Sequence, residues 1–342
     1  MSNKGAVEAL DRSLRDLRGC KKIMGGLTVL LSGDFRQTLP VVPRGTRADE
    51  VKSCLKSSYL WKEITILYLK RNMRVHLTGS YESEDFAKFL LALGEGKLKE
   101  VENRIEIPTN FCQLVSDVAV FTNLIYPNLS TADEKSDEWF RDRIIMTSKN
   151  DAAQELNNLL LQRFKGSHKT YKSIDTVVEI EDAVNYPVEF LNTLNPPGMP
   201  PHLLSLKIGA PVMLLRNFKP PKLCNGTRLR ITALHNNVIE AIIITGCGSG
   251  ETVLIPRIPL IPSDYPFDFK RLQFPLKLCF AITINKCQGQ TLKVAGVDLR
   301  EDCFSHGQLY VAFSRVSSKK NFYVLQPEGK TRNVVYPEVL KN

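Results

Sequence analysis

Hydrophobic positions near the start of the chain follow first a helical and then a strand-like pattern. Apolar residues three or four positions apart predict an amphipathic helix over residues 5–18, namely Val7, Leu10, Leu14 and Leu17. Leu27–Leu31 is an uninterrupted apolar run, which predicts a strand buried on both faces of a parallel sheet. The polar stretch after it would then lie at the carboxyl edge of that sheet, where open α/β sheets bind ligands.

Predicted strands and helices alternate up to about residue 186. Strands are expected at Ile64–Leu69 and Ile144–Met146, and helices over residues 83–93 and Asp151–Phe164. This alternation is typical of an α/β fold. It ends before Asn195–Pro201, in which four prolines and a glycine predict a rigid, irregular connector.

The pattern of predicted secondary structure changes after the connector. Short β-prone runs are separated by turns rich in Gly, Asn and Pro, at Pro211–Leu215, Leu229–Leu234, Val238–Thr245 and Glu251–Pro256. This spacing predicts a small all-β barrel or sandwich. Because α/β texture resumes near residue 268, we predict an α/β protein that carries a β insert at about residues 187–262.

Composition leaves room for two or three soluble domains. The 342 residues are 43% hydrophobic and 24% charged, and no apolar run approaches the roughly 20 residues of a membrane span. Nothing behind Met1 reads as a signal peptide. The eight cysteines are dispersed without a Cys-x-x-Cys pair, which argues against a zinc site and favours a reducing compartment, the nucleus or the cytoplasm.

The net charge of +10 is concentrated in one part of the chain. Residues 1–200 hold 27 basic and 27 acidic side chains, whereas residues 201–342 hold 19 and 9. A one-sided basic excess is typical of a nucleic-acid partner, although a solvated, Lys-rich surface would give the same count.

Three polar segments carry candidate chemistry. The first reads Gly-Asp-Phe-Arg-Gln-Thr-Leu-Pro-Val over residues 33–41. An amide such as that of Gln37 can donate to a terminal phosphate oxygen and accept from an attacking water. Gly-Asp alone would also fit a simple polar turn after a strand.

The second segment, residues 280–292, contains Thr-Ile-Asn-Lys-Cys-Gln-Gly-Gln-Thr and precedes a predicted strand at Val294–Leu299. Gly289 would let backbone amides approach a phosphate. The hydroxyls of Thr283 and Thr291 and the charge of Lys286 suit a nucleic-acid backbone. The alternative is a polar loop between two elements.

The third segment reads Gly-Gln-Leu-Tyr-Val-Ala-Phe-Ser-Arg-Val over residues 307–316. A guanidinium at the Arg315 position could stabilise charge in a phosphoryl-transfer transition state. A lone arginine near a helix end would otherwise be a capping or surface charge.

In this order the segments resemble the third, fifth and sixth motifs of Pif-one-type DNA helicases of superfamily one. The helicase part of Helitron transposon proteins is the most similar version. The resemblance runs from about residue 5 to 325. It implies an α/β fold with RecA-like, P-loop NTPase-type parallel sheets, the first incomplete, and an SH3-like β insert. The implied domains are a remnant of the first RecA-like domain at 1–70, the second at 71–186 and 263–342, and the insert at 187–262.

The resemblance also implies the residues of the site. Gln37, Arg315 and Arg74, the last in an Asn-Met-Arg segment at 72–74, would act on the γ-phosphate of ATP. The other nucleotide contacts would be Gly33, Asp34 and Gly289. Single-stranded DNA would contact Arg216, Arg228, Thr283, Asn285, Lys286, Gln288 and Thr291. The implied activity is ATP- and Mg²⁺-dependent 5′→3′ movement on DNA, in telomere maintenance, repair, recombination or transposition. The implied compartment is the nucleus, with the mitochondrion as the family's other compartment.

Two motifs of such an enzyme are not found in the sequence. No Gly-x-x-x-x-Gly-Lys-Ser/Thr occurs, and Gly94–Lys97 lacks the first glycine and the hydroxyl. No apolar strand ends in Asp-Glu. We therefore expect a chain truncated before the third motif, or a short form completed by an N-terminal half in trans. With an unpaired sheet edge, residues 1–70 are expected to be poorly stable. The alternative function is a single-stranded DNA-binding fragment, or transposon relic, without ATPase activity.

Overall fold

The computed structural model describes residues 2–43, 45–69, 81–179, 185–262, 265, 267–316 and 319–341. The chain divides into two compact units. The first consists of residues 1–116, 287–290 and 297–342, and the second of residues 117–286 and 291–296. In the described parts of the chain, no helix has the length and apolar character needed to cross a membrane.

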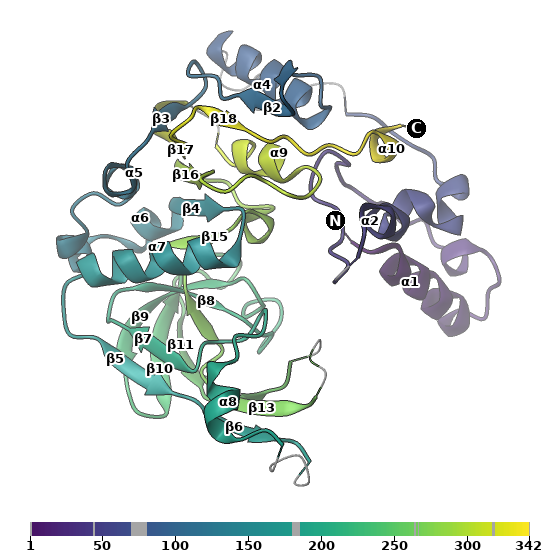
Figure 1. The fold of residues 1–342 in the computed structure, drawn as a ribbon. Coiled ribbons are helices and arrows are strands. Elements are labelled where there is room, and N and C mark those ends of the chain that lie inside the picture. Colours follow the sequence, from purple (N-terminus) through teal and green to yellow (C-terminus); the bar gives the residue numbers. More distant parts are fainter. Residues whose placement is uncertain are drawn as a thin grey trace. The chain divides into compact units, whose positions relative to one another are not determined.

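The first unit combines helices with short strands (Figure 1). Its helical elements are α1 (Lys4–Leu17), η1 (Ile23–Gly26), α2 (Arg47–Ser53), η2 (Leu55–Ser57), η3 (Tyr59–Glu63), α4 (Tyr81–Gly94), α9 (Gln308–Phe313), η7 (Lys319–Asn321) and α10 (Pro337–Leu340). Its strands are β1 (Glu100–Val101), β2 (Arg104–Glu106), β3 (Gln113–Val115), β17 (Phe322–Leu325) and β18 (Lys330–Thr331). Strand β3 runs parallel to the fully buried β17, and β2 pairs antiparallel with β1 and β18.

Two strands predicted for this unit are wrong. Leu27–Leu31 and Ile64–Leu69 are not strands, and Leu30 and Leu69 are 88% and 100% exposed. A parallel strand needs a neighbour for its backbone groups and apolar neighbours for both faces. Among the residues that the structure describes, no strand pairs with either run. The predicted parallel sheet is therefore not formed by this part of the chain.

Helix α1 confirms the predicted amphipathic helix, but a carboxylate is its anchor. Leu10 and Leu17 are exposed, whereas Asp11 is fully buried. Its carboxylate accepts bonds from the Met24 amide at 2.6 Å, from the Tyr59 hydroxyl at 2.8 Å and from Arg15 at 2.8 Å. Burial alone would raise the pKa of Asp11, but these bonds outweigh it and hold the pKa below its ordinary value. Asp11 thus ties α1 to two later segments.

The second unit begins with an α/β part that matches the prediction. Its elements are α5 (Val118–Ile125), η4 (Leu129–Glu134), α6 (Asp137–Arg141), β4 (Arg143–Thr147), α7 (Asn150–Arg163) and β15 (Ala281–Thr283). Strands β4 and β15 pair in parallel, and α7 packs on both (Figure 1). The buried Asn157 amide bonds both backbone groups of Ala281, at 2.8 and 2.9 Å. Two further elements, η6 (Ile284–Cys287) and β16 (Val294–Asp298), include residues assigned to both units.

The strand-rich part confirms the β runs after the connector. A five-stranded antiparallel sheet has the order β11-β10-β9-β8-β14, formed by Thr252–Pro256, Val238–Ile243, Arg228–Leu234, Pro211–Leu214 and Leu276–Leu278. Strands β5 (Lys169–Lys172) and β7 (Leu203–Leu206) pair separately, as do β6 (Ile174–Val177), β12 (Ile258–Leu260) and β13 (Phe269–Gln273). The strand-rich part thus runs beyond the predicted insert of 187–262 at both ends. The insert's domain limits and its SH3-like character stay predictions.

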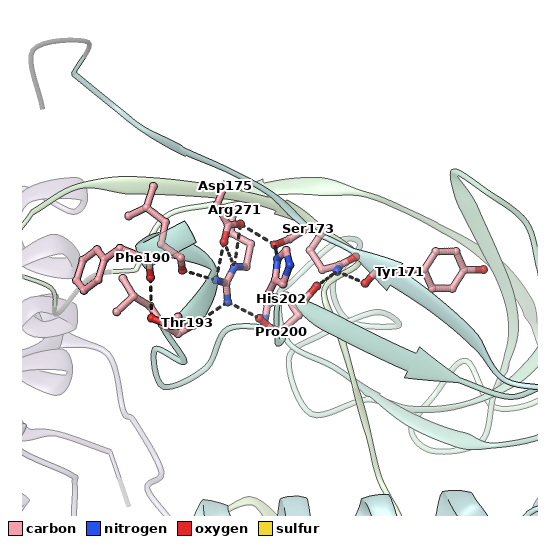
Figure 2. Close-up of polar contacts among 11 residues, drawn as sticks. Tyr171, Ser173, Asp175, Phe190, Thr193, Pro200, His202 and Arg271 are labelled. Atoms are coloured by element: carbon pink, nitrogen blue, oxygen red, sulfur yellow. Dashed lines mark hydrogen bonds and ion pairs between the residues drawn. The ribbon is translucent and has the colours of Figure 1, made fainter. Parts of the chain in front are cut away.

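A buried ion pair joins β13 to β6, to helix α8 (Val188–Thr193) and to the proline-rich connector (Figure 2). Arg271 and Asp175 are both fully buried and lie 2.7 Å apart. The remaining guanidinium donors bond carbonyls of Leu191, Leu194 and Pro200 at 3.0 to 3.1 Å. One side chain on β13 therefore bonds three other chain segments, and it ties the connector down through Pro200 without secondary structure.

Removing the carboxylate of this pair should destabilise the second unit strongly. Asp175→Ala leaves the buried Arg271 charge uncompensated, which costs about 3–5 kcal/mol. The matched control is Glu251→Ala, which breaks an exposed pair with Lys222 and should cost at most about 1 kcal/mol. The measurement is urea unfolding followed by Trp139 fluorescence in a Trp61→Phe background. Equal losses in the two variants would contradict the assigned role of the pair.

Candidate functional site

The segment Asp34–Thr38 forms a tight turn. The Asp34 carboxylate accepts from the Arg36 amide at 3.0 Å, and the Gln37 amide donates to the Asp34 carbonyl at 3.1 Å. An aspartate that bonds the backbone two residues on is a common way to build such a turn. The turn therefore keeps its shape although no strand precedes it.

Side chains from distant parts of the sequence hold this turn. The Tyr310 hydroxyl donates to Asp34 at 2.8 Å, and Arg36 pairs with Glu95 at 2.7 Å. Burial and the neighbouring Asp34 carboxylate raise the pKa of Tyr310, so its hydroxyl remains a donor. The turn is thereby held by α9 and by the residue that follows α4.

Two glycines allow the backbones to meet. A Cβ on Gly307 would lie 2.2 Å from the carbonyl oxygen of Arg36, and Gly307 also has a φ of +70°. A Cβ on Gly94 would lie 2.8 Å from the Tyr310 ring and 2.9 Å from the Arg36 side chain. Real Cβ atoms do not approach other atoms this closely, so only glycine fits at the two positions in this arrangement.

A buried histidine completes the contact. His306 Nδ1 accepts from the Tyr336 amide at 2.8 Å, and Nε2 lies 2.8 Å from the Phe35 carbonyl. Since Nδ1 is an acceptor, the ring is neutral and Nε2 carries the hydrogen that bonds Phe35. Burial lowers the pKa of His306, which favours the same neutral form.

Gln37 and Gln288, predicted for different ligands, lie together. The Gln288 amide nitrogen donates to Gln37 Oε1 at 2.7 Å, and its oxygen accepts from the Thr38 hydroxyl at 3.1 Å. The first and second polar segments of the sequence thus meet through two amides. Gln288, predicted to bind DNA, contacts the predicted phosphate sensor in this structure.

Arg315 lies just after α9 and is 8% exposed. Its guanidinium donates to the carbonyls of Val311 at 2.9 Å and Gln290 at 3.2 Å, and to the Ser314 hydroxyl at 2.6 Å. Loop 288–290 therefore contacts Gln37 through one residue and Arg315 through another.

No contact within the described residues requires glycine at the other predicted nucleotide-binding positions, Gly33 and Gly289. Gly289 has a φ of +83° and Gly33 does not lie in the left-handed region, and a Cβ on either would meet open space. Arg74 lies outside the described residues. In the parts of the chain that are described, no group of three or more His, Cys, Asp or Glu side chains could hold a metal ion.

Two cations predicted to bind DNA, Arg216 and Lys286, both belong to the second unit and repel each other electrostatically. Burial, and next the charge of Arg216, lower the pKa of Lys286. Lys286 Nζ donates to the Asn225 side chain at 3.3 Å, and Arg216 bonds the carbonyl of Gly198 at 2.9 Å. An anion that interacts with both cations would relieve this repulsion.

The remaining residues predicted to contact DNA all belong to the second unit. Thr283 is half-buried on β15, and Asn285 is half-buried in η6. Thr291 is exposed after the loop. Their hydroxyl and amide groups lie in the second unit with Lys286.

Arg228 requires a correction. It is fully buried, and its guanidinium donates to the carbonyls of Phe140 at 2.8 Å, Arg141 at 3.0 Å and Arg143 at 3.1 Å. The carbonyls of Phe140 and Arg141 lie at the end of α6, where a helix leaves acceptors without partners, and that of Arg143 begins β4. The structure therefore replaces the predicted DNA contact of Arg228 by a structural role, because a charge count does not distinguish buried from exposed arginines.

Four residues that hold the site together were not identified from the sequence: Arg36, Glu95, His306 and Tyr310. Tyr310 belongs to the third polar segment, where only the terminal arginine suggested chemistry. Gly307 at the start of that segment was an available signal, since a glycine before a helix is compatible with close backbone approach. Glu95 had no signal, because its partner is 59 positions away.

Adding a methyl group at Gly307 should displace the turn. Gly307→Ala should destabilise the first unit by more than about 1 kcal/mol, because the Cβ meets the Arg36 carbonyl and φ is positive. Gly19→Ala, where φ is also positive but no atom lies within 4 Å, should cost at most about 1 kcal/mol. Trp61 fluorescence in a Trp139→Phe background reports the change, since Trp61 packs edge-on against Phe35 at 5.5 Å. Equal effects would contradict the close approach.

The neutral His306 should make the first unit sensitive to acid. Its stabilising contribution is fully present above the unfolded histidine pKa of about 6.5. It is lost as pH falls below that value, because the unfolded chain binds the proton more readily. Urea unfolding monitored by Trp61 should show a steeper loss between about pH 6.5 and 5.5 for the wild type than for His306→Gln. Parallel pH profiles would contradict the assigned protonation state.

Comparison with known proteins identifies relatives for the whole chain. A family model described as PIF1-like helicase matches residues 1–104, and one described as DNA helicase Pif1, 2B domain, matches residues 189–234. The ATP-dependent DNA helicase PIF6 of Trypanosoma brucei brucei is 27% identical over 335 residues. This match covers 91% of the chain and 38% of that relative, so the chain spans less than half the relative's length.

Solved structures share the fold. The crystal structure of the Pif1 helicase from Candida albicans matches with a TM-score of 0.66 and 23% identity, covering 99% of this chain and 72% of that one. A Bacteroides Pif1 helicase in complex with ADP-AlF3 and single-stranded DNA matches with a TM-score of 0.67 and 20% identity, covering 98% and 70%. These matches confirm the predicted RecA-like α/β fold class. Both family models describe Pif1-like helicases, so the chain is similar to that family in two separate segments.

Proposed function

We propose that this chain is the nucleotide-sensing and DNA-gripping part of an ATP-dependent DNA helicase. The observation that carries the proposal is loop 288–290. Gln288 on this loop bonds the amide of Gln37, and Gln290 bonds the guanidinium of Arg315. A change at either side chain is thereby transmitted to the same short loop.

The residues of the first unit suit a terminal phosphate. Gln37 Oε1 is occupied by Gln288, while its amide nitrogen has no partner among the described residues and keeps two hydrogens to donate. Arg315 supplies the positive charge that phosphoryl transfer needs. Bound ATP would supply the free energy for movement along DNA. The residues that would hold its other phosphates, and Mg²⁺, are not identified in this chain.

The second unit supplies the grip on DNA. Arg216 and Lys286 are two cations that repel each other, and a bound phosphate would relieve that repulsion. Hydroxyls and amides such as those of Thr283 and Asn285 can position a nucleic-acid backbone without reading its sequence. The Bacteroides relative, crystallised with ADP-AlF3 and single-stranded DNA, supports both ligands for this chain.

Further properties of the complete enzyme follow from the resemblance alone. We propose 5′→3′ movement, a nuclear location and a role in telomere maintenance, repair, recombination or Helitron transposition. We also retain the proposal that an N-terminal partner in trans supplies missing functions. The second candidate function is a single-stranded DNA-binding fragment without turnover.

Nucleotide turnover separates the two candidates. Under the helicase proposal, the chain should hydrolyse ATP in a DNA-stimulated reaction when an N-terminal half in trans supplies the missing P-loop and acid pair. Arg315→Ala should lower the rate by about 10³-fold, because a charge at the transition state is lost. The control Arg104→Ala, which removes an exposed arginine paired with Asp302 and Glu328, should leave the rate unchanged. DNA binding without any stimulated hydrolysis would instead favour the fragment.

The DNA grip predicts a change in salt dependence. Lys286→Ala and Arg216→Ala should each weaken binding to an oligothymidylate and reduce the salt slope by about 0.7 for each lost phosphate contact. Fluorescence anisotropy between about 50 and 200 mM salt measures both quantities. Lys222→Ala is the matched control, because Lys222 is already paired with Glu251. Wild-type affinity and slope in both variants would contradict the proposed grip.

A further inference from the structure

The second unit contains a cavity that the proposed function does not use. It has a volume of about 520 Å³ and lies between helix α7 and strands β7 and β14. Cavities of roughly 300–1,000 Å³ are typical of small-molecule sites. The volume is therefore large enough for a ligand of nucleotide size.

One wall is a row of amides on α7. Gln154, Asn158 and Gln162 are spaced four residues apart and therefore lie on one side of the helix. Gln154 Nε2 donates to Asn158 Oδ1 at 2.9 Å, which fixes the orientation of both amides. Asn158 then presents its two N–H donors and Gln154 its oxygen. This pattern of donors and acceptors suits the edge of a nucleobase.

The strands β7 and β14 add leucines and a lysine to the lining. Leu203 on β7 and Leu278 on β14 line the cavity, and either can pack against a planar ring. Lys277 is half-buried between Leu276 and Leu278, and burial lowers its pKa. Within the described chain, its ammonium group makes no hydrogen bond or ion pair.

The cavity has a positive character. Lys277 and Lys207 both line it, and no carboxylate is among its lining residues. Lys207 Nζ donates to the Phe164 carbonyl at 2.6 Å. Its ammonium group therefore contributes positive charge to the cavity but is held in place by this bond. Lys277 is not held in this way, although the Asp151 carboxylate outside the lining acts on its charge, so Lys277 is the group that can move onto an anion.

We propose that this cavity binds a nucleoside monophosphate unit, with the phosphate on Lys277 and the base edge on the amides of α7. The unit is either a free nucleotide or one nucleotide of a bound single strand, since the recognised chemistry is the same. The site does not depend on the proposed helicase activity, because none of its residues takes part in the proposed nucleotide-sensing site or in the Arg216–Lys286 grip.

Binding of thymidine 5′-monophosphate to the full chain tests the proposal. Isothermal titration should show binding of this probe and about tenfold weaker binding of thymidine, which lacks the phosphate. Lys277→Ala should weaken the monophosphate about tenfold, and Lys277→Arg should retain most of the affinity. The control Arg216→Ala should leave it unchanged while weakening oligothymidylate binding.

A second variant covers the case in which Lys277→Ala fails to fold. Asn158→Leu removes an amide from the exposed side of α7 and should also weaken the monophosphate. If an oligothymidylate competes with the monophosphate in wild type and in Arg216→Ala, the ligand is a unit of a strand. If it does not compete, the ligand is a free nucleotide. Undetectable binding of the monophosphate to the wild type, or equal binding of thymidine, would overturn the proposal.

Discussion

The arrangement of the candidate site depends on one close contact, between the turn Asp34–Thr38 and the start of α9. Gly307 lets the two backbones touch, and the Tyr310–Asp34 bond and the neutral His306 hold them there. The turn has no strand of its own to support it, so these tertiary contacts replace the sheet. Gln37 meets Gln288 only because the turn is held in this position.

Buried charged side chains also hold separate chain segments together elsewhere in each unit. Asp11 ties α1 to Met24 and Tyr59, and Arg271 ties β13 to β6, α8 and the connector. Each charged group is fully hydrogen-bonded, which offsets the cost of burying it. Such pairs define specific geometry rather than add large net stability, because the same space could be filled by apolar side chains. They explain how segments without regular secondary structure have fixed positions here.

The two proposed ligand sites of the second unit show how the same residue types can have different uses. Arg228 and Lys207 direct their charges at backbone carbonyls, which removes them from contact with solvent ligands. Arg216, Lys286 and Lys277 keep their charges near a surface or cavity. The difference lies in burial, because Arg216 also bonds a backbone carbonyl but is half-buried, whereas Arg228 and Lys207 are at most 9% exposed. A basic composition thus indicates a polyanion partner but does not say which cations bind it.

Local patterns in the sequence determined the three helices α1, α4 and α7, the four β runs after the connector and the order of the polar segments. These depend on spacing between nearby residues, and the motifs were sufficient to indicate the Pif1-like helicases. The tertiary structure decided the rest. Leu27–Leu31 and Ile64–Leu69 are apolar and strand-like, yet neither is a strand, because a strand requires a partner that spacing cannot supply. The burial of Arg228 and the meeting of Gln37 with Gln288, 251 positions apart, likewise depend on contacts between remote segments.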